Sequence, residues 1–408
     1  MKIWHPYTQA AAEPPPVEID RGEGAYLFTR NGRRLIDAIS SWWVNIHGHA
    51  NPRIAAAIAD QVHKLEQVIF AGFTHGPAEE LAERLGRIVP AGLDRVFYSD
   101  NGSTAVEVAL KIAIQYWYNL GRPKKNRIVA LEHAYHGDTI GAMSVSADSP
   151  FTAAFEALRL PVFRVRNANE LEQLLDERED EIAGMIVEPL VQGAGGMLMY
   201  PPAELKRFGA LCGTHQVLFI ADEVFTGMGR TGRMFACDHA EVTPDLMCVS
   251  KGLTGGFLPF AATLCRDQIY EPFENEDRSR TFFHGHSFAG NPLGCAAAIA
   301  TLKIFDEEPV FERIGAIEAI HRQRLPEFEN NPKVLDVRMM GTIAAIEIRT
   351  GDVGYLSSLR ARLYGEFLEA GVLLRPLGNV VYTVPPYVIR PEDLHYIYDV
   401  IGKTLSQL

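Results

Sequence analysis

Short apolar runs alternate with longer amphipathic stretches between about residue 50 and residue 300. The runs that are typical of buried strands cover residues 95–100, 127–132, 184–189, 217–223 and 246–251. Two longer stretches, residues 104–119 and 203–215, have the periodicity of helices. Alternating strands and helices predict a mainly parallel sheet with helices on both faces, because each connection returns across the sheet.

The pattern changes after a small-residue helix expected over residues 291–305. The stretch from 306 to 408 mixes helices, expected at 308–325 and 354–370, with short strands at 341–348 and 380–386. This mixture predicts a smaller α+β domain. Residues 1–50 contain loops and short strand-like pieces, and we expect them to pack with it. The predicted division is an N-terminal segment, a large domain and a small domain, covering residues 1–50, 51–305 and 306–408.

Length and charge narrow the class of protein. A chain of 408 residues exceeds one ordinary core, and its net charge of −12 gives no general attraction to nucleic acid or to an anionic membrane. None of the five cysteines is spaced C-x-x-C, which argues against a zinc cluster or a disulfide framework and favours the cytoplasm. No stretch approaches the ~18 apolar residues of a membrane span. We expect no metal site, no nucleic acid and no membrane partner.

Lys251 is the first candidate for chemistry. It comes directly after the apolar run 246–250 and before a glycine-rich turn. Ligands of open α/β sheets bind beyond the carboxyl ends of the strands, where a lysine can lose solvation and acquire the lowered pKa that an imine-forming amine needs. The alternative is a surface lysine at the end of a strand.

Asp222 ends another apolar run, at residues 217–222. Pyridoxal phosphate (PLP) needs an anionic partner at its pyridine nitrogen so that the ring stays protonated and accepts electrons. A lysine and an aspartate at neighbouring strand ends can face one planar ring, and together they predict a PLP site. Asp222 alone is equally compatible with a helix cap or a loop carboxylate.

Two further motifs fit such a site. Gly102, Ser103 and Thr104 fall at an expected helix start, where N–H groups, hydroxyls and the helix dipole can hold a phosphate. Simple capping by Ser103 or Thr104, with Glu107 in the first turn, is the alternative. Tyr135 follows the run 127–132, so that its ring can stack on a cofactor or line a pocket. The nearby His136 and Asp138 can equally hold a loop together, and Glu188 can support a cofactor or merely end a strand.

Residues 227–232 match the dinucleotide pattern G-x-G-x-x-G, but we interpret them differently. Asp222 and Glu223 precede the glycines and would repel a pyrophosphate, and the residues that follow form a poor helix. We expect a tight turn that exposes Arg230. An NAD-dependent oxidoreductase would rest on these glycines alone.

Six strings in one order resemble the class III aminotransferases, which belong to fold type I of the PLP enzymes. The strings are NGSTAVEVALK, AYHGDT, VEPLVQGAGGM, ADEVFTGMGRTG, SKGLTGG and HGHSFAGNPLGCAA. The resemblance implies an α/β large domain with a mainly parallel sheet of seven strands and helices on both faces, a smaller α+β domain from the chain ends, PLP as cofactor, and a homodimer with shared active sites.

The resemblance also implies roles for single residues. Lys251 would hold PLP covalently and move the substrate proton, and Asp222 would pair with the pyridine nitrogen. Tyr135 would flank the ring. The phosphate would lie on Gly102 and Ser103 of one subunit and on Ser287 of the other, with His286 beside it. His286 stands where relatives commonly have proline, so it can alter substrate preference.

The two chain ends narrow the resemblance to a branch of class III that acts in biotin biosynthesis. The strings WHPYT, SWW, IHG and RPLG, with Tyr382 and PPY, carry this match. It implies S-adenosylmethionine as amino donor, 8-amino-7-oxononanoate as acceptor and 7,8-diaminononanoate as product. Trp42, Tyr7, Tyr135 and Gly285 would line the substrate site, with Tyr7 also catalytic. Arg375 would bind the acceptor carboxylate, as a bidentate guanidinium can.

The sequence leaves alternatives open for the amino donor, the substrate class and the roles of single residues. Lysine can replace S-adenosylmethionine as donor, and the chain can be another class III enzyme acting on an ω-amino acid or a diamine. A PLP-binding regulatory module without turnover is disfavoured, because no basic DNA-binding segment is present. Trp42 and Trp43 would point in opposite directions in an extended segment, one into the core and one into a pocket. Arg375 can instead form a structural salt bridge.

Overall fold

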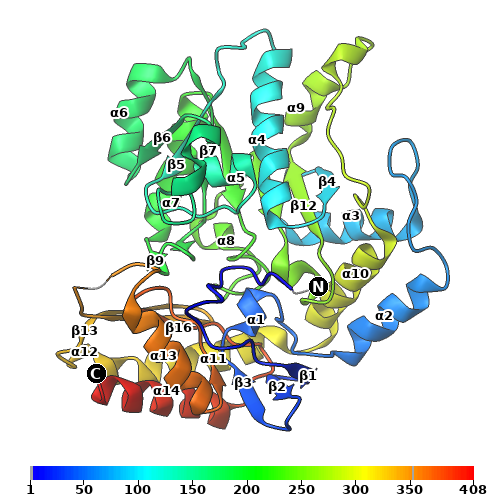
Figure 1. Cartoon of the computed structure of the whole chain (residues 1–408). Coiled ribbons are helices and arrows are strands. Elements are labelled where there is room, and N and C mark those ends of the chain that lie inside the picture. The colour runs from blue at the N-terminus through cyan, green and yellow to red at the C-terminus, as the bar shows by residue number, and fades with distance from the viewer. Residues whose placement is uncertain (1–2, 352) are drawn as a thin grey trace.

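A seven-stranded sheet forms the centre of the larger part of the computed structural model, which describes residues 3–351 and 353–408 (Figure 1). The strand order is β4 (Arg95–Ser99), β12 (Ala261–Cys265), β11 (Leu246–Val249), β10 (Leu218–Asp222), β7 (Ile182–Val187), β5 (Arg127–Leu131) and β6 (Val162–Val165). Only β12 runs antiparallel to its neighbours. The prediction of a mainly parallel sheet of seven strands is therefore confirmed.

Alternate residues of the central strand β10 enter two separate apolar clusters. Leu218 and Ile220 pack in the cluster that contains α4 (Gly102–Asn119), whereas Phe219 and Ala221 pack in the cluster that contains α7 (Pro202–Thr214). Since side chains alternate across a strand, helices cover both faces of the sheet. The remaining longer helices of this part are α2 (Pro52–Val62), α3 (Gly76–Ile88), α6 (Ala168–Arg178) and α10 (Pro292–Glu307).

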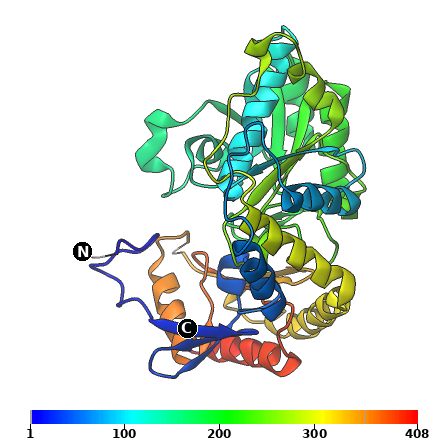
Figure 2. The ribbon, with the colours of Figure 1, turned by 90° about the vertical axis from the view of Figure 1, so that its right-hand side faces the viewer.

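The two ends of the chain build the smaller part together (Figure 2). One sheet has the order β1 (Ile19–Glu23), β2 (Tyr26–Thr29), β3 (Arg34–Asp37) and β15 (Val372–Leu373), and a second has the order β13 (Val334–Met340), β14 (Ile343–Ile348) and β16 (Val380–Thr383). The parallel pair β3–β15 joins the N-terminal segment to the C-terminal one. The helices of this part are α11 (Val310–Arg324), the short α12 (Pro326–Glu329), α13 (Ser358–Glu369) and α14 (Pro391–Ser406). The domain boundaries at residues 50 and 305 stay predictions. They are supported by the sheet that strands from both ends of the chain form together.

A left-handed turn, α1 (Ser40–Trp43), corrects the expectation of an extended segment at Trp42 and Trp43. All four residues have positive φ, between 45° and 76°. Left-handed backbone costs about 1–2 kcal/mol per residue for side chains with a Cβ, so the surrounding contacts must hold it. Ser40 Oγ donates to the carbonyl of Val384 at 2.8 Å, and Ser41 Oγ donates to the Asp37 carboxylate at 2.8 Å.

Within the described residues, no helix has the length and apolar character that a membrane span requires. The same residues contain no group of three or more His, Cys, Asp or Glu side chains that is arranged to bind a metal ion.

Candidate active site

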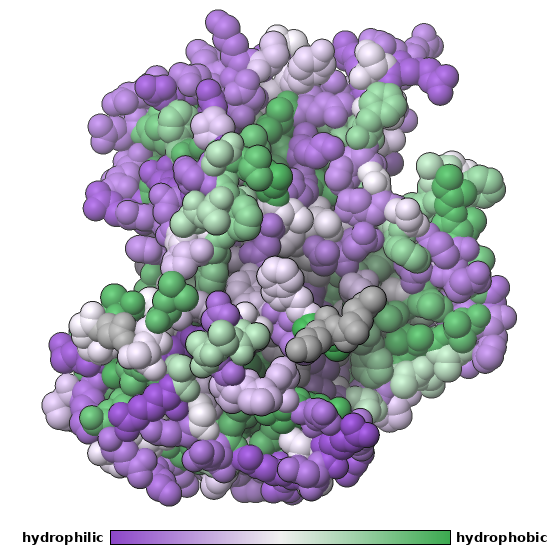
Figure 3. Space-filling model, viewed as in Figure 1, coloured by the Kyte–Doolittle hydropathy of each residue, from purple (hydrophilic) through white to green (hydrophobic). Residues whose placement is uncertain are grey.

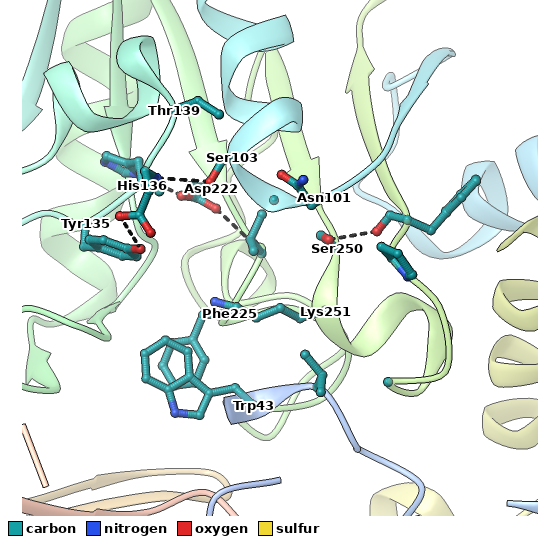
Figure 4. A pocket seen from close by; sticks show the side chains of 18 of the residues that line it. Trp43, Asn101, Ser103, Tyr135, His136, Thr139, Asp222, Phe225, Ser250 and Lys251 are labelled. Carbon is teal, nitrogen blue, oxygen red and sulfur yellow. Dashed lines mark hydrogen bonds and ion pairs between the residues drawn. The ribbon is translucent and has the colours of Figure 1, made fainter. Parts of the chain in front are cut away.

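A cavity of about 580 Å³ opens where β5, β10 and β11 end and α4 begins (Figure 4). It adjoins a second cavity of about 290 Å³, since Trp43, Tyr135, Asp138 and Lys251 line both. The large sheet therefore supplies one side of the site, and the left-handed turn α1 supplies the other. Lys251, Asp222, Gly102, Ser103 and Tyr135 all line the first cavity, as the sequence motifs predict.

Lys251 begins a short 3₁₀ turn, Lys251–Thr254, directly after β11. Its Nζ lies 4.5 Å from the ring centre of Trp43 and 5.7 Å from that of Phe225. Burial lowers the pKa of Lys251 to about 8, although the charges of Asp222 and Glu188 act in the opposite direction. The interpretation as a surface lysine is therefore wrong, and the amine has the lowered basicity that imine formation requires.

Asp222 is a buried carboxylate with two fixed partners. The Nδ1 atom of His136 lies 2.7 Å from one Asp222 oxygen, and the N–H of Val224 donates to the other oxygen at 3.1 Å. His136 is itself buried, and its Nε2 has no hydrogen-bond partner among the described residues. His136 thus orients Asp222 toward the cavity rather than merely holding its own loop (Figure 4).

Glu188 also faces this cavity from the end of β7. It accepts the N–H groups of Tyr135 and Gly193, each at 2.9 Å, and therefore fixes the backbone that carries Tyr135. Burial raises the pKa of Glu188 to about 7, and the nearby Asp222 charge acts in the same direction. Its support of the site could not be decided from the sequence, because a glutamate before a proline is equally compatible with a simple strand end.

The start of α4 has the features of an anion site. The cap is made by Asn101 and Thr104, which bond reciprocally at 3.1 and 3.0 Å, so the Ser103 hydroxyl is not needed for capping. Glu107 accepts the N–H groups of Gly141 and Ala142 instead. The capping alternative is thus confirmed for Thr104 and wrong for Ser103 and Glu107. Free N–H groups, a hydroxyl and an 18-residue helix dipole fit a phosphate at this position.

Two glycines keep this anion site open. A Cβ on Gly102 would lie 2.6 Å from Val224 Cγ1, and a Cβ on Gly137 would lie 2.1 Å from Ser103 Oγ. The cavity therefore combines an amine of lowered basicity, an oriented carboxylate and an anion cradle. These three groups fit the aldehyde, the pyridine nitrogen and the phosphate of PLP.

We expect Gly137→Ala to weaken PLP binding by about 10- to 100-fold, because the new methyl group displaces Ser103 and strains a residue whose φ is +129°. Equilibrium titration of the apoenzyme with PLP measures the change. Gly121→Ala is the control, because Gly121 has a φ of +75° but open space at its Cβ position. Equal PLP affinity in the two variants would contradict the role of the cradle.

Aromatic side chains dominate the second cavity, which Tyr7 and Trp42 line as predicted. The Tyr7 hydroxyl donates to the Asp138 carboxylate and lies 3.3 Å from the Tyr135 hydroxyl. Burial and this bond to Asp138 raise the pKa of Tyr7 to about 12. The sequence patterns did not single out Phe151 or Tyr355, which line the same cavity, because isolated aromatic residues in loops carry no motif.

Arg375 lies behind this aromatic wall. One Arg375 nitrogen donates to the Tyr355 hydroxyl at 3.0 Å, and the guanidinium carbon lies 5.3 Å from the ring centre of Trp42. In the described part of the chain no carboxylate forms an ion pair with Arg375, and its buried Nε lacks a partner. The structural salt bridge considered for Arg375 is absent from these residues.

Gly285, His286 and Ser287 do not line either cavity of their own chain. Gly285 and Ser287 are exposed, His286 Nδ1 lies 3.1 Å from the Asp100 carboxylate, and the Ser287 carbonyl accepts a bond from Gln67. A single chain thus leaves this predicted part of the site separate from the rest.

Arg230 is buried, with 1% of its surface exposed, so the expectation that the glycine turn exposes it is wrong. Its guanidinium donates to the carbonyls of Pro385 at 2.9 Å and Trp43 at 3.2 Å. The glycines of residues 227–232 therefore turn the chain so that Arg230 ties the large sheet to the left-handed turn. No pyrophosphate pattern could indicate such a contact.

The comparisons with known proteins agree with this geometry. The model of the family described as aminotransferase class-III matches residues 7–405. The chain is 47% identical to an adenosylmethionine-8-amino-7-oxononanoate aminotransferase of Synechococcus elongatus, covering 100% of this chain and 99% of the relative. It is 41% identical to the protein of the same name from Geobacter sulfurreducens, over 99% of this chain and 95% of that one.

Two solved structures are also similar. An adenosylmethionine-8-amino-7-oxononanoate aminotransferase from Methanocaldococcus jannaschii has a TM-score of 0.93 and 36% identity, covering 99% of this chain and 97% of that chain. An amine transaminase from an uncultivated Pseudomonas species, in its PLP-bound form, has a TM-score of 0.93 and 31% identity, over 100% and 99%. The chain belongs to the class-III aminotransferases of fold type I, and its cofactor is pyridoxal phosphate.

Proposed function

We propose that this protein transfers an amino group from S-adenosylmethionine to 8-amino-7-oxononanoate, giving 7,8-diaminononanoate in biotin biosynthesis. One observation carries the proposal: the cavity that holds Lys251 and Asp222 adjoins an aromatic cavity whose Tyr355 and Trp42 contact Arg375, and Arg375 has no carboxylate partner among the described residues. A guanidinium of this kind suits the carboxylate at the far end of a long aliphatic chain, away from the reacting ketone. The names of the two curated relatives support the same substrates.

Bound PLP supplies a protonated ring that accepts electrons from the substrate α-carbon. Lys251 would hold the cofactor, and its amine would carry the substrate α-proton as general base and then as general acid. Asp222, oriented by His136, keeps the proton on the ring nitrogen. The N-terminus of α4 with Gly102 and Ser103 holds the phosphate, and Tyr135 flanks the ring. Tyr7 and Trp42 wall the substrate and exclude water, while Arg375 fixes the acceptor carboxylate.

The covalent attachment of PLP to the apoenzyme should accelerate as the pH rises through about 8, because only the unprotonated Lys251 amine attacks an aldehyde. Burial lowers the pKa of this amine from 10.5, so the protonated form prevails below pH 8 and the rate reaches a plateau near pH 9. Stopped-flow absorbance measures the rate. A rate that keeps rising to pH 10.5 would show that Lys251 retains the basicity of an exposed lysine.

We also propose a homodimer with shared active sites, in which Ser287 and His286 reach the phosphate site of the partner. Large apolar side chains are exposed in two neighbouring segments: Ile69 and Phe73 between α2 and α3, and Phe283 and Phe288 next to Ser287. Figure 3 shows apolar residues on the loop between α2 and α3. Because monomeric proteins rarely expose large apolar patches, these residues support an interface with a second copy of the chain.

We place the protein in the cytoplasm, which suits its five unpaired cysteines.

Analytical ultracentrifugation should give twice the mass of 45.3 kDa, and Ser287→Ala should weaken PLP binding by about 5- to 20-fold without changing this mass. Ser279→Ala is the control, since Ser279 lies on the same long connection outside both cavities. A monomer with full PLP affinity would exclude the shared site.

The substrate assignment is tested by incubating the PLP-loaded protein with 8-amino-7-oxononanoate and one donor at a time. Mass spectrometry should detect 7,8-diaminononanoate with S-adenosylmethionine. Product formed only with lysine would retain the acceptor and change the donor. If 8-amino-7-oxononanoate is not converted by any donor, and the protein instead transfers the amino group of an ω-amino acid or a diamine to another acceptor, the proposed function is rejected.

A further inference from the structure

Six aromatic side chains line the second cavity, and four of them contact one another ring to ring: Tyr7, Trp42, Phe151 and Tyr355. Tyr7 lies 5.3 Å from Trp42 and 5.5 Å from Phe151, at interplanar angles of 70° and 88°. Phe151 lies 4.7 Å from Tyr355 at 71°. Rings that meet at such steep angles form the walls of a box rather than a stack. Trp42 comes from α1 and the other three residues from separate loops, so the box exists only in the folded chain.

The electrostatic character of this box favours a cation. The face of an aromatic ring carries negative potential, and among the described residues that line the cavity Asp138 is the only carboxylate. Arginines already lie over two of the rings: Arg375 over Trp42 at 5.3 Å and Arg360 over Tyr355 at 4.6 Å. Among the described residues no cation lies over Tyr7 or Phe151. Phe151 has no polar side-chain atom, so it offers only its ring to a ligand.

We propose that Tyr7, Trp42, Phe151 and Tyr355 form a cage for the positively charged sulfonium of the amino donor, and that Phe151 selects the donor by its charge. This inference rests on the proposed function, because it takes S-adenosylmethionine as donor. The donor amino group must reach the first cavity at Lys251, which also lines the second, and the sulfonium lies only a few bonds away along the same chain. Attraction between a cation and a ring is strongest where both are withdrawn from water.

The test measures binding to the pyridoxamine phosphate form of the enzyme, which lacks the aldehyde that an amino donor attacks. Isothermal titration compares S-adenosylmethionine with S-adenosylhomocysteine, whose thioether is uncharged. We expect Phe151→Leu to raise the Kd of S-adenosylmethionine about 10-fold and that of S-adenosylhomocysteine less than about twofold. Phe151→Tyr keeps a ring and should restore the wild-type ratio. Phe155→Leu is the matched control, because Phe155 is 49% exposed and outside the cavity.

If Phe151→Leu weakens both ligands equally, or weakens neither, the ratio of their dissociation constants stays unchanged. Either result would overturn the cage, since the ring would then act by packing alone or not at all. Lysine and the uncharged norleucine form a second pair of ligands. If Phe151→Leu weakens lysine more than norleucine but leaves the ratio for the first pair of ligands unchanged, the cage serves an ammonium donor and the sulfonium assignment is wrong. Failure of S-adenosylmethionine to convert the wild-type PLP form at all would instead reject the proposed donor, whatever the binding ratios show.

Discussion

Lys251→Ala will lose the near-ultraviolet to visible absorbance band of covalently attached PLP, and its turnover will fall by about 10⁴-fold. The substitution removes both the amine that attaches the cofactor and the base that carries the α-proton, and general acid–base catalysis alone contributes about 10²- to 10⁴-fold. Absorbance spectra of the variant loaded with PLP, together with single-turnover rates, measure the two losses separately.

Lys125→Ala is a matched control for this variant. Lys125 is also a buried lysine whose pKa burial lowers to about 8, and its Nζ also lies 4.5 Å from a tryptophan ring, that of Trp117. Because Lys125 donates to the Gln216 carbonyl far from the cavity, its loss should affect stability but leave the absorbance band intact. An unaltered band in Lys251→Ala would show that another amine holds the cofactor.

Asp222→Asn should reduce the rate of α-proton removal by about 10²- to 10³-fold while PLP remains covalently attached. A neutral amide cannot hold the proton on the ring nitrogen, so the ring loses the positive charge that stabilises the reacting carbon. The His136 contact then lacks its carboxylate partner as well. The measurement is the primary isotope effect and rate of the first half-reaction with an α-deuterated donor.

Glu223→Gln is the control for Asp222→Asn. Glu223 is the adjacent buried carboxylate, its pKa is raised to about 7 by burial, and it bonds to Thr226 and the N–H of Cys237 outside the cavity. If both variants slow proton removal equally, a general disturbance of the strand end explains the loss, and Asp222 has no special role.

The large sheet was predictable because its strands are continuous apolar runs with chemistry-bearing residues at their ends. Lys251, Asp222 and Ser103 meet in space for this reason: the carboxyl ends of parallel strands share one edge of the sheet. Two strands of the sheet escaped prediction: β12, because AATLC lacks the bulky β-branched residues that mark a strand, and β6, whose four residues VFRV include an arginine.

The aromatic side of the site was less predictable. The left-handed turn at Trp42 and Trp43 is imposed by partners distant in sequence, Arg230 and Val384, which no local pattern contains. Phe151 and Tyr355 enter the cavity by tertiary packing alone. Local propensity cannot indicate contacts that depend on where two remote segments meet.

Pairing of β3 with β15 has a consequence for synthesis on the ribosome. Every residue that lines the cofactor cavity from the large sheet has been added to the chain by Phe260, but β15 begins only at Val372. The N-terminal strands, made first, must wait for this late partner, and so must the turn that carries Trp42 and Trp43. A nascent chain can thus complete its cofactor half before the half that recognises substrate, and amino transfer becomes available only after β15 has been added.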